Sequence, residues 1–271
     1  MSYFKDRLGI IGGGVMAEAI LSRLISQKFC VPEQIQVSDI ASDRLHDLAD
    51  KYQVQVSTDN LAVASSSQVL LLAVKPQAFQ SVALQLQAAI PPGCLVLSIL
   101  AGIPLATLES AFKGCPVVRV MPNTPATVGA GMAALAAGCQ ANATHLALAR
   151  QLFSAVGKVV TVPETLMDAV TGLSGSGPAF VALVLEALTD GGVSVGLPRS
   201  IAAQLALQTL LGTATLVQET GLHPAQLKDQ VTSPGGTTIA GVAALEQAGL
   251  RSALIGAVQA AYQRSQELGQ D

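Results

Sequence analysis

A glycine-rich turn near the N-terminus constrains the fold of this chain most. The segment Leu8–Ile20 reads LGIIGGGVMAEAI, in which the apolar residues Leu8–Ile11, typical of a short strand, run through three glycines into a helical pattern. Gly12, Gly14 and Ala17 match the pattern G-x-G-x-x-A, in which the glycines allow a tight turn and close approach to a pyrophosphate. The small third residue lets the helix pack on the strand. The segment predicts a dinucleotide site, and a plain tight turn in an α/β sheet is the alternative.

Up to Val162 the sequence alternates between apolar runs and helical periodicity. The runs typical of strands are Leu8–Ile11, Ile35–Ser38, Gln53–Ser57, Val69–Val74, Leu95–Leu100, Pro116–Val120, Gly129–Ala137 and Lys158–Val162. Asn60 is the expected cap of the helix that leads to the run at Val69. This alternation predicts an α/β domain with a doubly wound parallel sheet over residues 1–163.

The pattern changes in residues 164–271, for which we expect an all-helical domain. Helices are predicted at Leu166–Ser174, Pro178–Gly191, Arg199–Thr220, Pro224–Val231, Thr237–Gln247 and Ser252–Leu268. The uncharged stretch Ser200–Gln218 is long enough to cross a membrane, but its glutamines and threonines favour a helix buried in protein. So much apolar surface is expected to be covered by a second subunit.

Composition narrows the classes of function. The 271 residues are 50% hydrophobic and 12% charged with a net charge of −3, which argues against a nucleic-acid partner. The N-terminal sequence lacks the apolar core of a signal peptide, so we expect a cytoplasmic protein. Four scattered cysteines are expected to be small buried hydrophobes, and three isolated histidines argue against a metal site.

Asp39 follows the second expected strand, about 20 residues beyond Ala17, where the ribose of the adenosine half is recognised. An acidic side chain there binds the 2′-hydroxyl of NAD and repels the 2′-phosphate of NADP. Ser38, Ser42 and Arg44 lie nearby in the sequence and offer a phosphate site instead, although Arg44 also fits a solvated helix face. The preference between NADH and NADPH therefore stays open.

Other polar segments follow strand ends, where ligands bind in parallel sheets. Lys75 and Pro76 fall at this edge, and a solvated loop is the alternative for Lys75. Residues 121–125, MPNTP, suit either a nicotinamide wall or a structural turn.

Further along, Gly235 and Gly236 precede Thr237 and Thr238 at the start of a helix. Backbone amides there suit a small carboxylate, with Ser233 in reach, and an ordinary capped loop is the alternative. The sequence shows no convincing acid–base pair, which favours reduction of a C=N bond, since that reaction needs mainly placement of the hydride donor.

The sequence resembles the pyrroline-5-carboxylate reductases along nearly its whole length. The segments that carry the resemblance are IGGGVMAEAI at 11–20, AVKP at 73–76, MPNTP at 121–125, DAVTGLSGSGPAF at 168–180, DGGVSVGLPR at 190–199 and LKDQVTSPGGTTIAG at 227–241. The resemblance implies reduction of 1-pyrroline-5-carboxylate to L-proline by NADPH or NADH, the last step of proline synthesis. It also implies an N-terminal Rossmann domain, a helical dimerisation domain and, in many members, rings of dimers.

The same resemblance implies site residues. Those expected at the dinucleotide are Ile11, Gly12, Gly13, Gly14, Val15, Met16, Asp39, Asn60, Ala73, Val74, Lys75, Pro76, Ile99, Leu100, Ala101 and Gln230. Those expected at the substrate are Ser233, Gly235, Gly236, Thr237 and Thr238, with the Thr238 hydroxyl near the ring nitrogen as the catalytic group, and Glu164 as a weaker candidate. Three positions depart from the usual family pattern, namely Val15, Gln230 and Asp39, and the last makes use of NADH plausible.

Two other functions fit parts of the sequence. A 3-hydroxyacid dehydrogenase of the 6-phosphogluconate type shares the glycine turn and the helical second domain, but it needs a helix lysine, and beyond Lys158 the chain offers only Lys228. A catalytically silent dinucleotide-binding sensor would bind without turnover.

Overall fold

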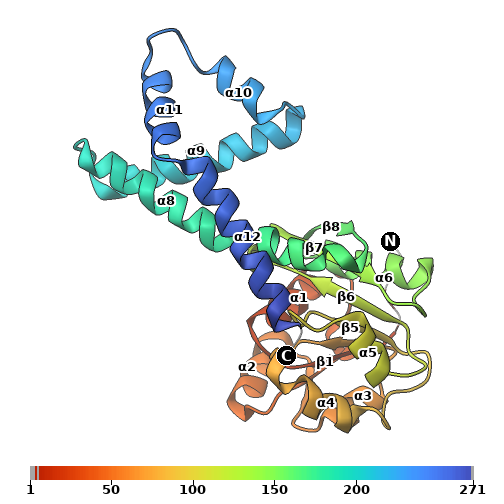
Figure 1. Ribbon diagram of the computed structural model, residues 1–271. Helices are drawn as coiled ribbons and strands as arrows, with labels where there is room; N and C mark the ends of the chain where they lie inside the picture. Colours follow the sequence, from red (N-terminus) through yellow and green to blue (C-terminus); the bar gives the residue numbers. More distant parts are fainter. Residues whose placement is uncertain (1–3, 5, 270–271) are drawn as a thin grey trace. The chain divides into compact units, whose positions relative to one another are not determined.

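A computed structural model describes residue 4 and residues 6–269 of the chain. The chain folds into two compact units (Figure 1). The first reaches to Ser176 and resumes at Ala261, and the second is Gly177–Ala260. The expected domain boundary between residues 163 and 164 stays a prediction, because compact units and functional domains need not coincide.

The first unit is built on one eight-stranded sheet with the strand order β3-β2-β1-β4-β5-β6-β7-β8. Its strands are β1 (Leu8–Ile11), β2 (Ile35–Ser38), β3 (Gln55–Ser57), β4 (Val69–Leu72), β5 (Leu95–Ser98), β6 (Val117–Met121), β7 (Gly131–Ala137) and β8 (Gly157–Thr161). All eight strands lie at the positions that the apolar runs predict. The chain order reverses beside β1, so the carboxyl ends of β1 and β4 flank a switch point.

The predicted doubly wound parallel sheet has one exception at its far edge. Strands β1 to β6 are parallel, but β7 runs antiparallel to β6, and β8 pairs parallel to β7. Only residues 122–130 join β6 to β7, and a parallel return needs a crossover of a dozen or more residues. The short connection therefore forces the reversal of direction.

Helices cover both faces of the sheet. In the first unit they are α1 (Val15–Ser26), α2 (Ser42–Tyr52), α3 (Asn60–Ser65), α4 (Phe79–Leu86), α5 (Leu105–Ala111), α6 (Ala143–Ser154) and α7 (Met167–Val170). Short 3₁₀ turns lie at η1 (Pro32–Gln34), η2 (Pro76–Ala78), η3 (Thr124–Val128) and η4 (Glu164–Leu166), and η5 (Thr171–Gly175) is a π-helical turn. The expected helix Leu166–Ser174 is thus broken into short pieces.

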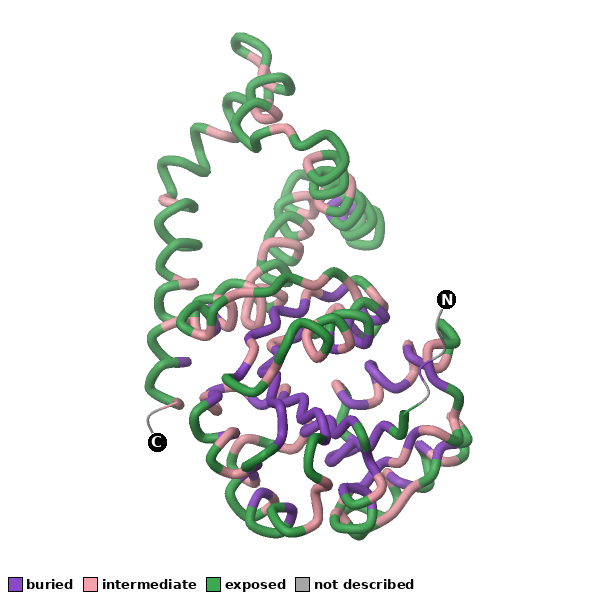
Figure 2. The backbone as a smooth tube through the Cα atoms, turned by 90° about the vertical axis from the view of Figure 1, so that its right-hand side faces the viewer, coloured by how far each residue is buried: buried purple, intermediate pink, exposed green. Residues whose placement is uncertain are grey.

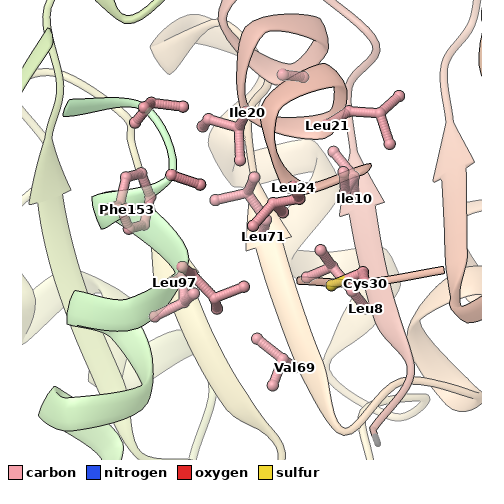
Figure 3. Packing of buried hydrophobic residues seen from close by; sticks show 14 of the residues in the cluster. Leu8, Ile10, Ile20, Leu21, Leu24, Cys30, Val69, Leu71, Leu97 and Phe153 are labelled. Carbon is pink, nitrogen blue, oxygen red and sulfur yellow. The ribbon is translucent and has the colours of Figure 1, made fainter. Parts of the chain in front are cut away.

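Alternation of side chains along the strands splits the core into two clusters. Ile10 belongs to the cluster under α1, α2 and α6, whereas Ile11 belongs to the cluster under α3, α4 and α5. Figure 3 shows the first cluster, in which strand side chains meet helix side chains, namely Leu8, Ile10, Val69, Leu71 and Leu97 against Ile20, Leu21, Leu24 and Phe153. This packing fixes the glycine turn between β1 and α1.

Two local expectations need correction. Asp59, not Asn60, caps α3, because its carboxylate accepts the amide hydrogen of Leu61 at 2.8 Å and Asn60 is already the first helical residue. Cys30, Cys94 and Cys115 are buried as expected, and burial raises the pKa of Cys30 to about 12. Cys139 is exposed, contrary to the expectation, because it lies in the surface turn between β7 and α6.

The second unit is helical, as the sequence predicts. It contains α8 (Gly177–Ser194), α9 (Arg199–Thr220), α10 (Pro224–Gln230), α11 (Thr237–Gln247) and the first part of α12 (Leu250–Leu268). Helices α8 and α9 pack together, and a Cβ on Gly192 would lie 2.9 Å from the Ala202 side chain. Glycine at this position therefore lets the two helices approach closely.

Most residues of the second unit are exposed in the single chain and are coloured green in Figure 2. Within one chain, α9 buries only Ala202 and Ala206, so the expectation that residues 200–218 are buried in protein stays a prediction about the assembled protein. Two helical runs, Glu164–Ser194 and Arg199–Thr220, are long and apolar enough to cross a membrane by length and composition alone. Helices in the cores of soluble proteins also meet that criterion.

Candidate functional site

The turn between β1 and α1 requires glycine at its first position. Gly12 has a φ of +100°, and a Cβ there would lie 2.7 Å from the carbonyl oxygen of Ala73. Its amide donates to the Ser38 carbonyl at 2.7 Å, and the amide of Ala73 donates to the Ile11 carbonyl at 2.8 Å. The turn is therefore locked between the ends of β2 and β4, with no space for a side chain.

The third glycine of the turn has open space around it. A Cβ on Gly14 would meet no other atom within 4 Å, and Val15 beside it is 73% exposed. Gly14 caps α1 without a side-chain hydrogen bond, and the amide hydrogens of Gly14, Val15 and Met16 have no acceptor among the described residues. Donors at the positive end of a helix, beside room for a ligand, fit a pyrophosphate. The residues present therefore fit a dinucleotide.

Asp39 is bound directly to the glycine turn. The amide of Gly13 donates to its Oδ2 at 2.7 Å, and the amide of Ala41 donates to its Oδ1 at 2.9 Å. The carboxylate is thereby fixed at the carboxyl end of β2, beside the turn. This is where an acidic side chain can bind a ribose hydroxyl.

Arg44 on α2 reaches the same turn from the other side. Its Nε donates to the Gly13 carbonyl at 2.7 Å, and its Nη2 is paired with Glu18 on α1. Lys51 Nζ and the Tyr52 hydroxyl donate to the other Glu18 oxygen at 2.9 and 2.8 Å. These donors, Arg44 first among them, lower the pKa of Glu18 to about 2. The alternative of a solvated helix face for Arg44 is therefore wrong.

The remaining residues expected at the dinucleotide from the first unit line the same sheet edge. The Ser38 hydroxyl donates to Asn60 Oδ1 at 2.7 Å, which holds α3 beside β2. Residues 73–76 directly follow β4, with Lys75 exposed, and residues 99–101 directly follow β5. Leu100 is buried and belongs to the second core cluster. These positions agree with the parallel-sheet rule that ligands bind beyond the carboxyl ends of strands.

The segments at 121–125 and 168–180, two of those that carry the family resemblance, contact each other beyond the end of β6. The Asn123 amide nitrogen donates to the Ser174 hydroxyl at 3.3 Å, and its carbonyl accepts the Met132 amide at 2.8 Å. A Cβ on Gly175 would lie 2.6 Å from the Met121 side chain. The 121–125 loop thus packs on the π-helical turn η5, and the Asn123 side chain serves this structure.

Sequence reasoning missed a polar cluster around Arg119. This arginine on β6 is buried, with Nη1 3.2 Å from Glu164 Oε1 and Nη2 3.9 Å from Asp168 Oδ1. The Ser265 hydroxyl of α12 donates to Asp168 at 2.8 Å. The cluster borders a cavity of about 290 Å³ beside Gly102. A charged residue inside the apolar run VVRVM was the signal for it.

The loop before α11 has an open helix N-terminus. Gly235 has a φ of +66°, and Gly236 caps α11 without a side-chain hydrogen bond. A Cβ on Gly236 would lie 2.4 Å from Ser233 Oγ, so glycine is needed for this serine to lie over the helix end. In the described chain the amide hydrogens of Thr237 and Thr238 have no acceptor. This arrangement fits a carboxylate.

The predicted site residues fall in both compact units. Gln230, at the end of α10, belongs to the second unit, whereas the other residues expected at the dinucleotide belong to the first. Glu164 belongs to the first unit, where it binds Arg119 and the Leu105 amide, and the other residues expected at the substrate belong to the second. The roles of Gln230 and Glu164 at a ligand stay predictions.

Comparisons with known proteins agree with these features. Residues 164–268 match the family model described as pyrroline-5-carboxylate reductase dimerisation, and residues 7–102 match one described as NADP oxidoreductase coenzyme F420-dependent. The chain is 61% identical to the pyrroline-5-carboxylate reductase of Synechocystis sp. over 97% of its own length and 98% of the relative.

Solved structures agree as well. A pyrroline-5-carboxylate reductase from Coxiella burnetii is 36% identical with a TM-score of 0.91, covering 98% of this chain and 99% of that one. A pyrroline carboxylate reductase from Plasmodium falciparum, solved with NADP bound, is 29% identical with a TM-score of 0.90, covering 99% of this chain and 100% of that one. By its sequence along nearly its full length and by its fold, this chain belongs to the pyrroline-5-carboxylate reductase family.

Proposed function

We propose that this chain reduces 1-pyrroline-5-carboxylate to L-proline, the last step of proline biosynthesis, with the site residues assigned below. As a member of the family it is an NAD(P)H-dependent oxidoreductase. The observation that carries the proposal is the pair of open helix N-termini in the chain, one behind the glycine turn at α1 and one behind Gly236 at α11. The first suits a pyrophosphate and the second a small carboxylate.

The first unit supplies the residues proposed to bind the dinucleotide. The unpaired amides at the start of α1 bind the pyrophosphate, and the fixed carboxylate of Asp39 binds the ribose. Residues 73–76 and 99–101 border the same sheet edge and form the walls of the site. Lys75 is exposed there, and its proposed role is to face a phosphate.

The second unit supplies the residues proposed to bind the substrate. Amides at the start of α11 and the Ser233 hydroxyl bind the carboxylate of the pyrroline ring. Thr238 is half-buried one residue inside the helix, and its hydroxyl makes no hydrogen bond to another described residue. It is therefore available to bind the ring nitrogen.

The reaction adds two hydrogen atoms across the C=N bond. When bound, the reduced nicotinamide supplies the hydride that forms the new C–H bond at the imine carbon. The ring nitrogen takes a proton, for which the Thr238 hydroxyl, directly or through water, is the proposed route. Binding the carboxylate fixes the ring, and placement at about 3–3.5 Å supplies much of the rate enhancement in such a transfer.

The activity of a 3-hydroxyacid dehydrogenase is less well supported by the structure. Such an enzyme needs a helix lysine as its acid–base group, and Lys228 on α10 is instead paired with the neighbouring Asp229 at 2.9 Å. Family membership likewise favours an enzyme over a silent sensor.

The exposed apolar faces of the second unit support pairing of two copies. Leu205, Leu207 and Leu211 on α9 are each more than half exposed in the single chain. Since residues 164–268 match a dimerisation family model, we infer that a second copy, and not a lipid bilayer, covers these faces. Assembly of dimers into rings and a cytoplasmic location belong to the same proposal.

Two measurements test the function. Initial rates with 1-pyrroline-5-carboxylate and each reduced cofactor should show consumption of NAD(P)H with formation of proline, and binding without turnover would refute the reaction. Light scattering after gel filtration without detergent should give a dimer or a multiple of it, and a monomer would refute the pairing.

A further inference from the structure

Gly13, in the middle of the glycine turn, is bound on both sides by charged side chains. Its amide donates to Asp39 at 2.7 Å, and its carbonyl accepts from Arg44 Nε at 2.7 Å. A Cβ on Gly13 would lie 3.4 Å from Asp39 Oδ2, so the carboxylate lies directly against the turn. Two oppositely charged side chains, Asp39 and Arg44, are therefore held by hydrogen bonds to the middle residue of the turn.

Glu18 determines where the arginine points. One carboxylate oxygen of Glu18 binds Arg44 Nη2, and the other binds Lys51 and Tyr52. The Glu18 side chain is only 21% exposed and that of Arg44 only 29%, so solvent screens this pair partially. The guanidinium is thus held toward α1 by two groups, Glu18 and the Gly13 carbonyl.

The surrounding charge is unfavourable for another anion. From residue 39 to residue 51 the chain carries two cations, Arg44 and Lys51, and four carboxylates, Asp39, Asp43, Asp47 and Asp50. Both cations are bound to Glu18, which adds a fifth carboxylate. A phosphate monoester on the ribose carries nearly two negative charges and would enter this surface with no free cation from the segment to neutralise it.

We infer that Glu18 is a specificity-determining residue, which withholds Arg44 from the 2′-phosphate of the cofactor and so makes the chain prefer the dinucleotide without that phosphate. The inference rests on the proposed dinucleotide site. The inference goes beyond the role proposed for Asp39, because it assigns the discrimination between NAD and NADP to Glu18 on α1. This residue acts through Arg44 and not by contact with the ribose.

Equilibrium binding tests the inference without turnover. NAD⁺ and NADP⁺ differ only in the 2′-phosphate. Calorimetry gives the dissociation constant of each nucleotide, and the ratio of the two constants is compared between variants. The wild-type chain should bind NAD⁺ more tightly. Glu18→Gln frees the guanidinium and should shift the ratio toward NADP⁺ by about tenfold, the effect of one charge-assisted hydrogen bond. Adding Arg44→Gln to that variant should abolish the shift.

Lys51→Gln is the matched control. It removes a second cation from the same Glu18 carboxylate but leaves the contacts of Gly13 intact, so the ratio should stay within about twofold of wild type. Circular dichroism and the melting temperature of each variant show whether it is folded.

Either of two results with the variants overturns the inference. One is a folded Glu18→Gln variant that binds both nucleotides in the wild-type ratio. The other is selective loss of NADP⁺ binding in the single variant Arg44→Gln, which would mean that Arg44 already binds the 2′-phosphate in the wild-type chain. This variant keeps the inference testable if Glu18→Gln does not fold. If the nucleotides bind as expected but 1-pyrroline-5-carboxylate is not reduced, the proposed reaction fails and the specificity role stands. If the folded wild-type chain binds neither nucleotide, both fail.

Discussion

Arg119 Nη1 lies 3.2 Å from Glu164 Oε1, and the same carboxylate oxygen accepts the amide hydrogen of Leu105. The pair links β6 to η4 and to the start of α5. Because the Arg119 side chain is only 7% exposed, its charge depends on these partners and not on water. Glu164 therefore has a structural function that is separate from any contact with substrate.

Removal of this carboxylate should destabilise the first unit. We expect Glu164→Ala to lower the free energy of unfolding by about 1–3 kcal/mol, because it leaves a buried cation and a backbone amide with fewer partners. Urea denaturation measures the loss. Glu246→Ala is the control, since its pair with Arg251 is largely exposed and should contribute less than about 1 kcal/mol. Equal losses in the two variants would contradict the assignment.

The first and third glycines of the turn should respond differently to alanine. Gly12→Ala forces a positive φ and a clash with the Ala73 carbonyl, so it should lower stability as well as nucleotide binding. Gly14→Ala meets no atom of the chain, so its melting temperature should stay close to that of wild type, while NAD⁺ binding weakens by about tenfold or more. Undiminished nucleotide affinity in Gly14→Ala would argue against a pyrophosphate at this turn.

The charge of Asp39 should govern the choice of cofactor. Asp39→Ser and Asp39→Asn both remove the charge and should raise the NADPH-to-NADH ratio of kcat/KM by about tenfold. Asn keeps an oxygen that can accept the Gly13 amide, so only the serine variant should also bind both cofactors less tightly. An unchanged ratio in both variants would show that Asp39 does not face the ribose.

The Thr238 hydroxyl should matter for the reaction and not for folding. Thr238→Ala should lower kcat/KM for 1-pyrroline-5-carboxylate by about 10- to 100-fold, the range for one lost hydrogen bond of roughly 1.5–3 kcal/mol. Thr144→Ala on α6, an exposed threonine, is the control and should behave as wild type. Wild-type kinetics in Thr238→Ala would remove this residue from the site.

Glu18 should make stability depend on acid pH. Its pKa falls from 4.5 to about 2 in the folded chain, mainly through Arg44, so the folded state favours the charged carboxylate. Its stabilising effect is complete well above pH 4.5 and is lost as the pH falls toward about 2. Urea denaturation at a series of pH values should therefore show the stability difference between wild type and Glu18→Gln shrinking over this range. A difference that stays constant would contradict the ion pair.

Much of the fold could be predicted from local patterns. The strand predictions succeeded because each buried strand is a short apolar run bounded by turn residues, and α11 has the predicted bounds because glycine precedes it. The direction of β7 was missed, since a run of apolar residues carries no information about the direction of pairing. The prediction of Asn60 as the cap of α3 is wrong by one residue, because asparagine and aspartate are both good capping residues and only the backbone geometry shows that Asp59 holds that position.

The sequence by itself determined the α/β order, the glycine turn and the loop before α11, because these depend on backbone conformations and spacings within a few residues. Tertiary structure alone decided that Arg44 binds Glu18 and Gly13, and that Arg119 gathers Glu164, Asp168 and Ser265. Those contacts join residues far apart in the chain. A charged side chain takes the nearest compensating partner that packing of the elements brings to it, and that partner is not encoded in the local pattern.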